Sequence, residues 1–176
     1  MWSTTSRPVF RRFVGAVAVG VALAATSGCT VPIDAVAGIS VTGDGHPLGV
    51  IMVCGHHIDG ATLYVDSAHV DKQVTVGSRT ADHPLTAGLA TWTLDSPAAG
   101  WTATRSPAPL TAKTTYALHG WTKDNSWSAG SISFTLADLD QLTPGDVRYD
   151  NISDNGDASA ITVSTAEFKA RACQNM

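Results

Sequence analysis

The sequence is poor in the features that most enzymes and membrane-spanning proteins need. Glu167 is its one glutamate, so the residue types do not identify a pair of catalytic carboxylates. The motifs Gly-x-Ser-x-Gly and His-Glu-x-x-His and a glycine-rich phosphate loop are all missing. The longest apolar run spans residues 14–25, which is shorter than the roughly 20 residues of a spanning helix. We therefore expect a protein that is not an enzyme and keeps no spanning helix.

The first residues are typical of an export signal. Residues 1–14 carry three arginines and no acidic residue, and the apolar run follows directly. With Ser27–Cys29 behind it, this stretch resembles the lipobox of bacterial lipoproteins, although Thr26 stands where those proteins usually have Leu. The resemblance implies that residues 1–28 are a lipoprotein signal peptide, that this peptide is removed, and that Cys29 is acylated.

The same resemblance implies a location on the outer face of the cell membrane. The lipid on Cys29 would be the membrane contact, and residues 29–38 would form a tether. Ordinary secretion with cleavage near Ala25 is the alternative. The pair Arg11-Arg12 before Phe13 partly matches a twin-arginine signal, so the export route, general secretory or twin-arginine, stays open.

The charge balance narrows the set of partners. The chain has eleven Lys and Arg residues against fifteen Asp and Glu residues, and three of the basic residues lie in the signal region. The remainder, 8 basic against 15 acidic residues, therefore has a formal charge of −7. An acidic surface argues against nucleic acid and against direct adhesion to anionic headgroups. We expect an envelope protein, a secreted protein or a glycan as partner, and no cofactor.

Only three cysteines are present. With Cys29 assigned to the lipid, Cys54 and Cys173 remain as an even pair in a compartment where disulfides persist. We predict that these two are joined, and the alternative is two separate buried thiols. The bridge would tie the last segment of the chain to an early strand.

Segments rich in Val, Ile, Thr, Tyr and Trp recur after residue 38, separated by Gly, Pro, Asp, Asn and Ser. They predict ten strands: Ile39–Thr42, Leu48–Cys54, Ala61–Asp66, Gln73–Gly77, Leu89–Leu94, Trp101–Arg105, Thr115–Thr122, Ser128–Thr135, Asp146–Tyr149 and Ala160–Ser164. Leu48–Cys54 is apolar on both faces and is the expected central strand. Leu136–Leu142 has the spacing of one helical turn, and residues 164–173 fit either a strand or a short helix.

These elements predict an all-β fold, a single antiparallel β-sandwich over residues 39–176, behind an N-terminal signal helix. An immunoglobulin-like arrangement is one option, although the Cys-Trp-Cys spacing of true immunoglobulin domains is absent. The segment Ala137–Val147, with an early and a late cysteine, resembles uncharacterised actinobacterial secreted β-sandwich lipoproteins. That resemblance implies no particular activity.

Two groups of side chains are candidates for a binding site. Trp121 and Trp127 flank a predicted hairpin, where an exposed pair would stack on a sugar or dock a partner; the alternative is packing within the hairpin. Trp92 and Trp101 fall in alternating strands and are expected in the core. We take a non-catalytic interaction module that uses Trp121 and Trp127 as the first hypothesis.

The second candidate is a metal site. His56, His57 and Asp59 follow the expected central strand, and imidazole nitrogens suit zinc or copper. Three further histidines lie near enough in sequence to join them: His46, His69 and His83. The alternative hypothesis is therefore a lipoprotein that binds a metal or small ligand through His56, His57 and Asp59. The simpler interpretation of this cluster is a loop of solvated histidines that binds nothing.

Overall fold

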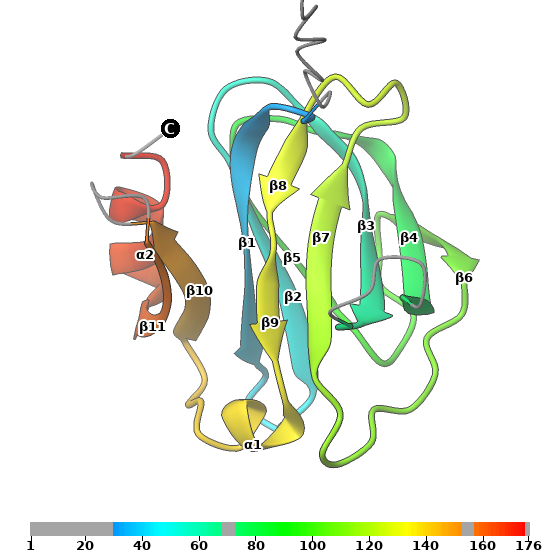
Figure 1. The fold of residues 1–176 in the computed structure, drawn as a ribbon, viewed down its shortest axis with the longest axis vertical. Helices are drawn as coiled ribbons and strands as arrows, with labels where there is room; N and C mark the ends of the chain where they lie inside the picture. Colours follow the sequence, from blue (N-terminus) through cyan, green and yellow to red (C-terminus); the bar gives the residue numbers. More distant parts are fainter. Residues whose placement is uncertain (1–29, 68–72, 153–156, 175–176) are drawn as a thin grey trace, which may run out of the picture.

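The computed structural model describes residues 30–67, 73–152 and 157–174. Its secondary structure consists of eleven strands and two short helices (Figure 1). The strands are β1 Ile33–Val41, β2 Pro47–Val53, β3 Ile58–Val65, β4 Val74–Leu85, β5 Gly88–Thr93, β6 Trp101–Arg105, β7 Tyr116–Trp121, β8 Ser128–Gly130, β9 Ile132–Phe134, β10 Asp146–Ile152 and β11 Ala158–Ser164. The helices are α1 Leu136–Leu139 and α2 Thr165–Arg171. The predicted all-β class is confirmed.

All strands belong to one curled sheet, in the order β11-β10-β1-β8-β7-β3-β4-β6, with β2 and β5 attached to the other edge of β1 and β9 attached to β7. The expected central strand lies in β2, which pairs with β1 and β5. The prediction of a purely antiparallel arrangement is wrong, because β8 runs parallel to the first half of β1, with Ala35 opposite Ala129. β10 then takes the same edge of β1 from Gly38 onward.

β1 begins at Ile33, earlier than the predicted strand start at Ile39. Residues 33–38 therefore belong to the sheet and not to the expected tether. No alternation is detectable there, because β1 is buried on both faces from Ala35 onward. Its odd-numbered residues from Ala35 to Val41 enter the main core, and Val36 enters a second cluster on the opposite face.

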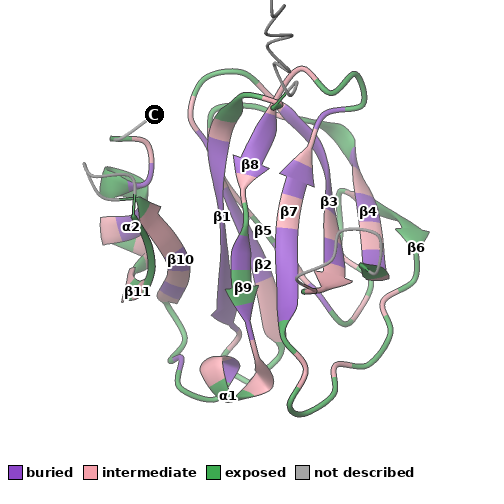
Figure 2. Ribbon diagram, viewed as in Figure 1, coloured by how far each residue is buried: buried purple, intermediate pink, exposed green. Residues whose placement is uncertain are grey.

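The main core fills the space between the β1-β2-β5 part of the curl and the β3-β7-β9 part (Figure 2). Its most deeply buried side chains include Ile51, Leu118 and Ile132. The two parts approach closely at Gly120, where an added Cβ would lie 2.9 Å from Ile51 Cδ1. The glycine thus permits β2 and β7 to pack against each other.

The second cluster is covered by β10, β11 and α2. Phe168 of α2 is fully buried and packs edge-on against Tyr149 with ring centroids 4.8 Å apart. α2 settles the ambiguity of residues 164–173: Ser164 caps the helix by accepting a hydrogen bond from Glu167 N. Beyond α2, the predicted disulfide between Cys54 and Cys173 is confirmed, with Cα atoms 5.5 Å apart.

The predicted turn near residue 136 is also confirmed as α1. Thr135 and Asp138 form a reciprocal capping box there. Arg148 of β10 contacts Asp138 at 3.3 Å and so fixes α1 to the sheet. No described helix has the length and apolarity that crossing a membrane would take.

Candidate functional site

The two predicted site tryptophans lie at the β7–β8 connection, and each is engaged within the molecule. Trp121 packs over Gly60 of β3, and its Nε1 donates a hydrogen bond to Thr62 Oγ1 at 2.9 Å. Trp127 stacks on His56 with ring centroids 3.6 Å apart and an interplanar angle of 17°. Both side chains are partly buried. The structure therefore places each ring against its own neighbour, and the two do not form one open platform.

The predicted metal residues His56, His57 and Asp59 lie near one another but are not arranged around a common point. His56 Nδ1 lies 2.7 Å from Asp34 Oδ2, and the same oxygen accepts a hydrogen bond from the His56 backbone. His57 Nε2 lies 3.6 Å from Asp59 Oδ2. Over residues 30–67, 73–152 and 157–174, no group of three or more His, Cys, Asp or Glu side chains is placed to hold a metal ion.

The carboxylates of this cluster have structural roles instead. Asp59 is buried and accepts a hydrogen bond from Lys123 N at 2.8 Å, so it fixes the β7–β8 connection. Partial burial raises the pKa of Asp34, but the hydrogen bonds and charge of His56 outweigh burial and bring it below its ordinary value. Of the three further histidines that the sequence suggested, His46 contacts Asp95 instead, His83 is exposed, and His69 lies outside the described residues.

The end that carries Trp127 is also the end at which the described chain begins (Figure 1). Ser128 donates hydrogen bonds to Pro32 O from its backbone nitrogen at 2.9 Å and from its hydroxyl at 3.2 Å. The β7–β8 connection is therefore held beside the residue that leads into β1. We call this the N-terminal end of the molecule, and the end with α1 the distal end.

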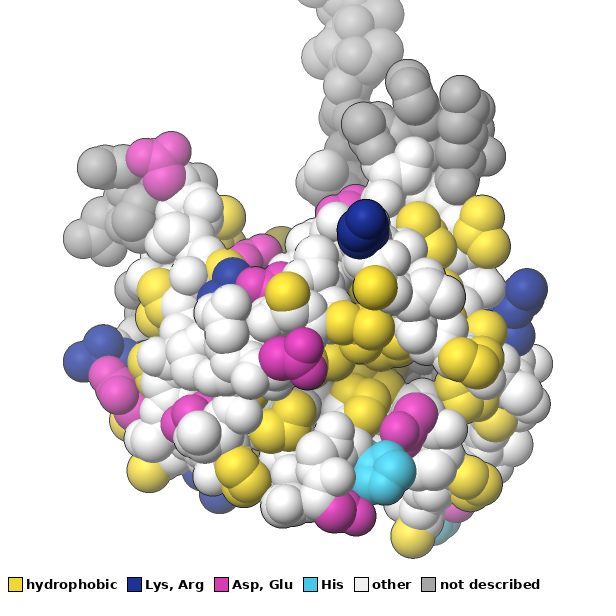
Figure 3. Space-filling model, turned by 90° about the horizontal axis from the view of Figure 1, so that it is seen from below, with side chains coloured by type: hydrophobic (Ala, Val, Ile, Leu, Met, Phe, Trp, Pro, Cys, Tyr) yellow, Lys and Arg dark blue, Asp and Glu magenta, His cyan; other side chains and the backbone are white. Residues whose placement is uncertain are grey.

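The distal end contains two adjoining hollows, which share Asp95 and Pro107. Figure 3 looks onto this end and shows hydrophobic side chains gathered in a depression, with acidic side chains and a histidine around it. The first hollow, about 360 Å³, is lined by Gly45, Pro47, Asp95, Pro107, Ala108, Pro109, Leu110, Leu136, Leu139 and Asp140. The second, about 320 Å³, is lined by Arg79, Asp95, Ser96, Pro97, Trp101, Ala103, Ser106 and Pro107.

The β6–β7 connection lines both hollows, and hydrogen bonds from its backbone nitrogens hold it in place. Ala108 N donates to Val76 O at 3.0 Å, and Thr111 N donates to Tyr116 Oη at 2.7 Å. Pro107 and Pro109 further limit the backbone of this segment. The β6–β7 connection is thus fixed at several points, as a preformed binding site requires.

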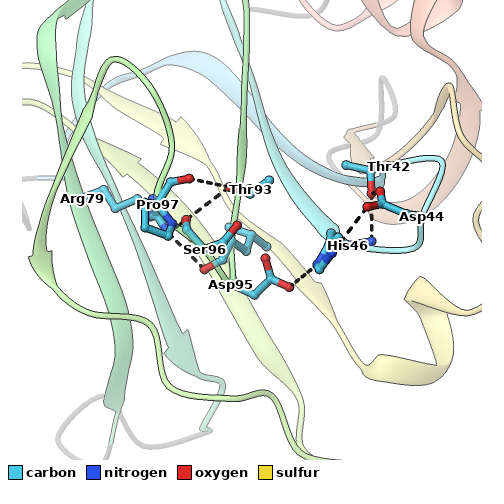
Figure 4. Close-up of polar contacts among 9 residues, drawn as sticks. Thr42, Asp44, His46, Arg79, Thr93, Asp95, Ser96 and Pro97 are labelled. Carbon is cyan, nitrogen blue, oxygen red and sulfur yellow. Dashed lines mark hydrogen bonds and ion pairs between the residues drawn. The ribbon is translucent and has the colours of Figure 1, made fainter.

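Acidic and basic side chains alternate in a row along the hollows (Figure 4). Asp95 Oδ2 lies 2.8 Å from His46 Nδ1, and His46 Nε2 lies 3.6 Å from Asp44 Oδ2. The hydrogen bond to Asp95 and the charges of Asp95 and Asp44 raise the pKa of His46. Thr42 completes this end of the row by accepting from His46 N at 2.9 Å.

Arg79 of β4 ends the row on the other side, and it is only 5% exposed. Its Nη2 donates to the backbone carbonyls of Ser96 at 2.5 Å and Leu94 at 3.4 Å. Within the described part of the chain no carboxylate forms an ion pair with it. Burial lowers the pKa of Arg79 while the charge of Asp95 opposes this, yet a guanidinium stays charged in proteins.

Trp101 gives the second hollow an aromatic wall. Its ring packs on Trp92 with centroids 4.4 Å apart. Trp92 is 4% exposed and belongs to the core as predicted, whereas Trp101 is partly buried and faces the hollow as well. Sequence reasoning missed this site, since Arg79, Asp95 and His46 come from three distant segments. The one available signal was the proline-rich stretch Ser106–Pro109, which excludes a regular strand.

Comparison of the chain with models of protein families, with curated proteins and with solved structures gives no match. The protein is therefore described by its fold and its hollows alone. It is an all-β protein with one described disulfide, and two preformed hollows lie at its distal end.

Proposed function

We propose that this protein is a lipid-anchored, extracytoplasmic binding module without catalytic activity, and that it takes its ligand in the distal hollows. In this proposal residues 1–28 are removed as a signal peptide, Cys29 carries the lipid, and the protein stands on the outer face of the cell membrane. The observation that carries it is the position of the hollows at the distal end, opposite the end at which the described chain begins (Figure 3).

The argument for this orientation rests on distances along the chain. Cys29 precedes Pro32 by three residues, which span about 11 Å at most when extended. β1 then runs from the N-terminal end to the distal end over nine residues, or about 30 Å. A lipid on Cys29 would keep the Trp127 end close to the bilayer and turn the hollows outward, toward an envelope or secreted component.

This orientation moves the proposed contact away from Trp121 and Trp127. Both rings are engaged by residues of the same molecule, and their end of the fold would face the membrane. The hollows are open instead, and they combine apolar walls with a few charged groups, which is the usual composition of a small-ligand site. Within the proposal we treat the curled sheet as a variant β-sandwich whose distal opening holds the ligand.

The geometry of His46 supports binding without catalysis. A general base needs a ring nitrogen that is free to accept a proton from the substrate. Nδ1 of His46 faces Asp95 at 2.8 Å, and Nε2 faces Asp44 at 3.6 Å. With a carboxylate at each nitrogen, the imidazole is positioned to hold the Asp44 and Asp95 loops together.

The proposal is tested by native mass spectrometry of the protein released from its own membrane in mild detergent. We expect an acylated chain with a retained small ligand. Ala103→Trp fills the second hollow from an exposed position, so the retained ligand should be lost. Ala160→Trp, the same change at an exposed site on β11, is the matched control and should keep it.

The anchor is tested separately with Cys29→Ser in the full chain. This variant should appear in the soluble extracytoplasmic fraction without the acyl mass. A Cys29→Ser protein that stays in the membrane would contradict the lipid anchor. Equal ligand retention by Ala103→Trp and Ala160→Trp, or no retained ligand in any variant, would contradict the binding role of the hollows.

A further inference from the structure

Arg79 is unusual because its charged side chain is buried and forms no ion pair among the described residues. Its side chain is 5% exposed, and buried charges are normally paired because their desolvation is costly. Its two recorded hydrogen bonds both leave from Nη2 and end on neutral backbone carbonyls. A guanidinium has five N–H donors, so the donors on Nε and Nη1 have no partner among the described residues. Neither nitrogen is among the fully buried, unpartnered side-chain atoms of the described residues.

Arg79 lines the second hollow together with Trp101. We propose that Arg79 binds the carboxylate of a ligand whose apolar body lies against Trp101 and Pro107. This inference rests on the proposed function of the hollows and adds the class of ligand. A planar carboxylate fits two adjacent N–H donors of a guanidinium, and such charge-assisted pairs are stronger than neutral hydrogen bonds.

The rest of the hollow favours an apolar monoanion. Trp101, Pro97 and Ala103 offer aromatic and aliphatic surface for the body of the ligand, and Ser106 adds a hydroxyl at its edge. The formal charge of −7 beyond the signal region disfavours polyanions such as oligophosphates. A single carboxylate on a hydrophobic group meets both conditions.

Among the described residues, Asp95 is the one acidic group that lines this hollow, and it forms no ion pair with Arg79. Its Oδ2 is bound to His46 Nδ1 at 2.8 Å, and it makes no ion pair with Arg79 within 4.0 Å. Among the described residues, no carboxylate therefore pairs with the guanidinium. A ligand carboxylate on the Nε and Nη1 side would supply the missing counter-charge.

The experiment follows the Arg79 Nε–H and Trp101 Nε1–H signals in ¹⁵N-edited NMR spectra during titration with phenylacetate and with phenylacetamide. The two probes share their shape and differ in charge. We expect phenylacetate to shift both signals and to bind at least about tenfold more tightly than the amide. A second pair, an apolar dipeptide ending in Phe with a free or an amidated C-terminus, should show the same preference. The tighter of the two carboxylates then identifies the source as a free acid or a protein C-terminus.

Variants complete the test. Arg79→Lys keeps the charge and loses the planar fork, so carboxylate binding should fall about tenfold. Because Arg79 also supports the 94–97 segment, Ala103→Trp blocks the hollow from an exposed position, and it should abolish the shifts in a protein that folds normally. Ala160→Trp should leave them intact.

Amides that bind as tightly as carboxylates, or carboxylates that shift Trp101 without shifting Arg79, would overturn the inference. A ligand without a carboxylate, retained in native mass spectra and displaced by Ala103→Trp, would do the same and leave the proposed function standing. Absence of any retained ligand together with absence of probe binding would remove both.

Discussion

His46 and Asp95 are separated by 49 positions in the sequence, yet His46 Nδ1 lies 2.8 Å from Asp95 Oδ2. The contact joins the β1–β2 turn to the segment after β5, and these two segments border the same hollow. It therefore joins two segments of the distal end through one imidazole.

The first prediction concerns the pKa of His46, which Asp95 raises in the folded protein. The stabilisation should be complete below the unfolded-state pKa of about 6.5, and it should be lost as the pH rises through the folded pKa. NMR titration of His46 Cε1–H should give a pKa above the ordinary value, and Asp95→Asn should lower it. An identical titration curve in Asp95→Asn would contradict the pairing.

The second prediction concerns the disulfide, which closes a loop between residues separated by 119 positions. Removing it frees α2 from the end of β2 and increases the freedom of the unfolded chain. The Cys54→Ser and Cys173→Ser double variant should lose about 2–5 kcal/mol of unfolding free energy in urea denaturation. Dithiothreitol should lower the unfolding free energy of the wild type to that of the variant and leave the variant's unfolding free energy unchanged. A wild-type unfolding free energy that does not respond to dithiothreitol would contradict the prediction.

The third prediction uses Gly60, which lies under the ring of Trp121. An added Cβ would lie 2.6 Å from Arg79 O and would also overlap the indole ring. Gly60→Ala should cost about 1–3 kcal/mol of stability by overpacking. Gly43→Ala is the matched control, because a Cβ there meets nothing within 4 Å. Equal midpoints for the two variants in thermal unfolding would show that Trp121 does not pack as described.

The fourth prediction separates the two tryptophans of the N-terminal end. Trp121→Ala removes the packing on Gly60 and the hydrogen bond to Thr62, so it should cost about 2 kcal/mol or more. Trp127→Ala removes one stacked contact with His56 and should cost about 1 kcal/mol. Chemical denaturation measures both. Unchanged stability in both variants would show that neither ring packs as described and would favour the earlier hypothesis that they dock a partner.

The strands could be predicted because their signal is local. Alternation in Ala61–Asp66 or Thr115–Thr122 reflects one face in the core, and neither segment extends more than one residue beyond the observed strand, β3 or β7, that it overlaps. β1 was missed over residues 33–38 because both of its faces are buried, which removes the alternation. Its parallel partner β8 could not be predicted either, since strand direction depends on how distant segments meet.

The predicted site residues were chosen for their side-chain chemistry alone. Trp121, Trp127, His56 and Asp59 do have specific contacts, but these contacts are with residues of the same molecule. Nothing in the sequence around Arg79 or Asp95 marks them as neighbours. A hollow has no local pattern, because it is formed by the edges of segments that are far apart in the chain.

The sequence by itself determined that the described chain is built of strands and that its last cysteine has a partner in Cys54, while a lipoprotein signal over residues 1–29 stays a prediction. Those features depend on residue type and local order. Only the tertiary structure decided that the sheet is mixed, that Arg79 is a buried cation without a carboxylate partner among the described residues, and that the hollows lie opposite the N-terminal end. Each of these depends on long-range packing, which brings together residues whose local sequence carries no sign of the others.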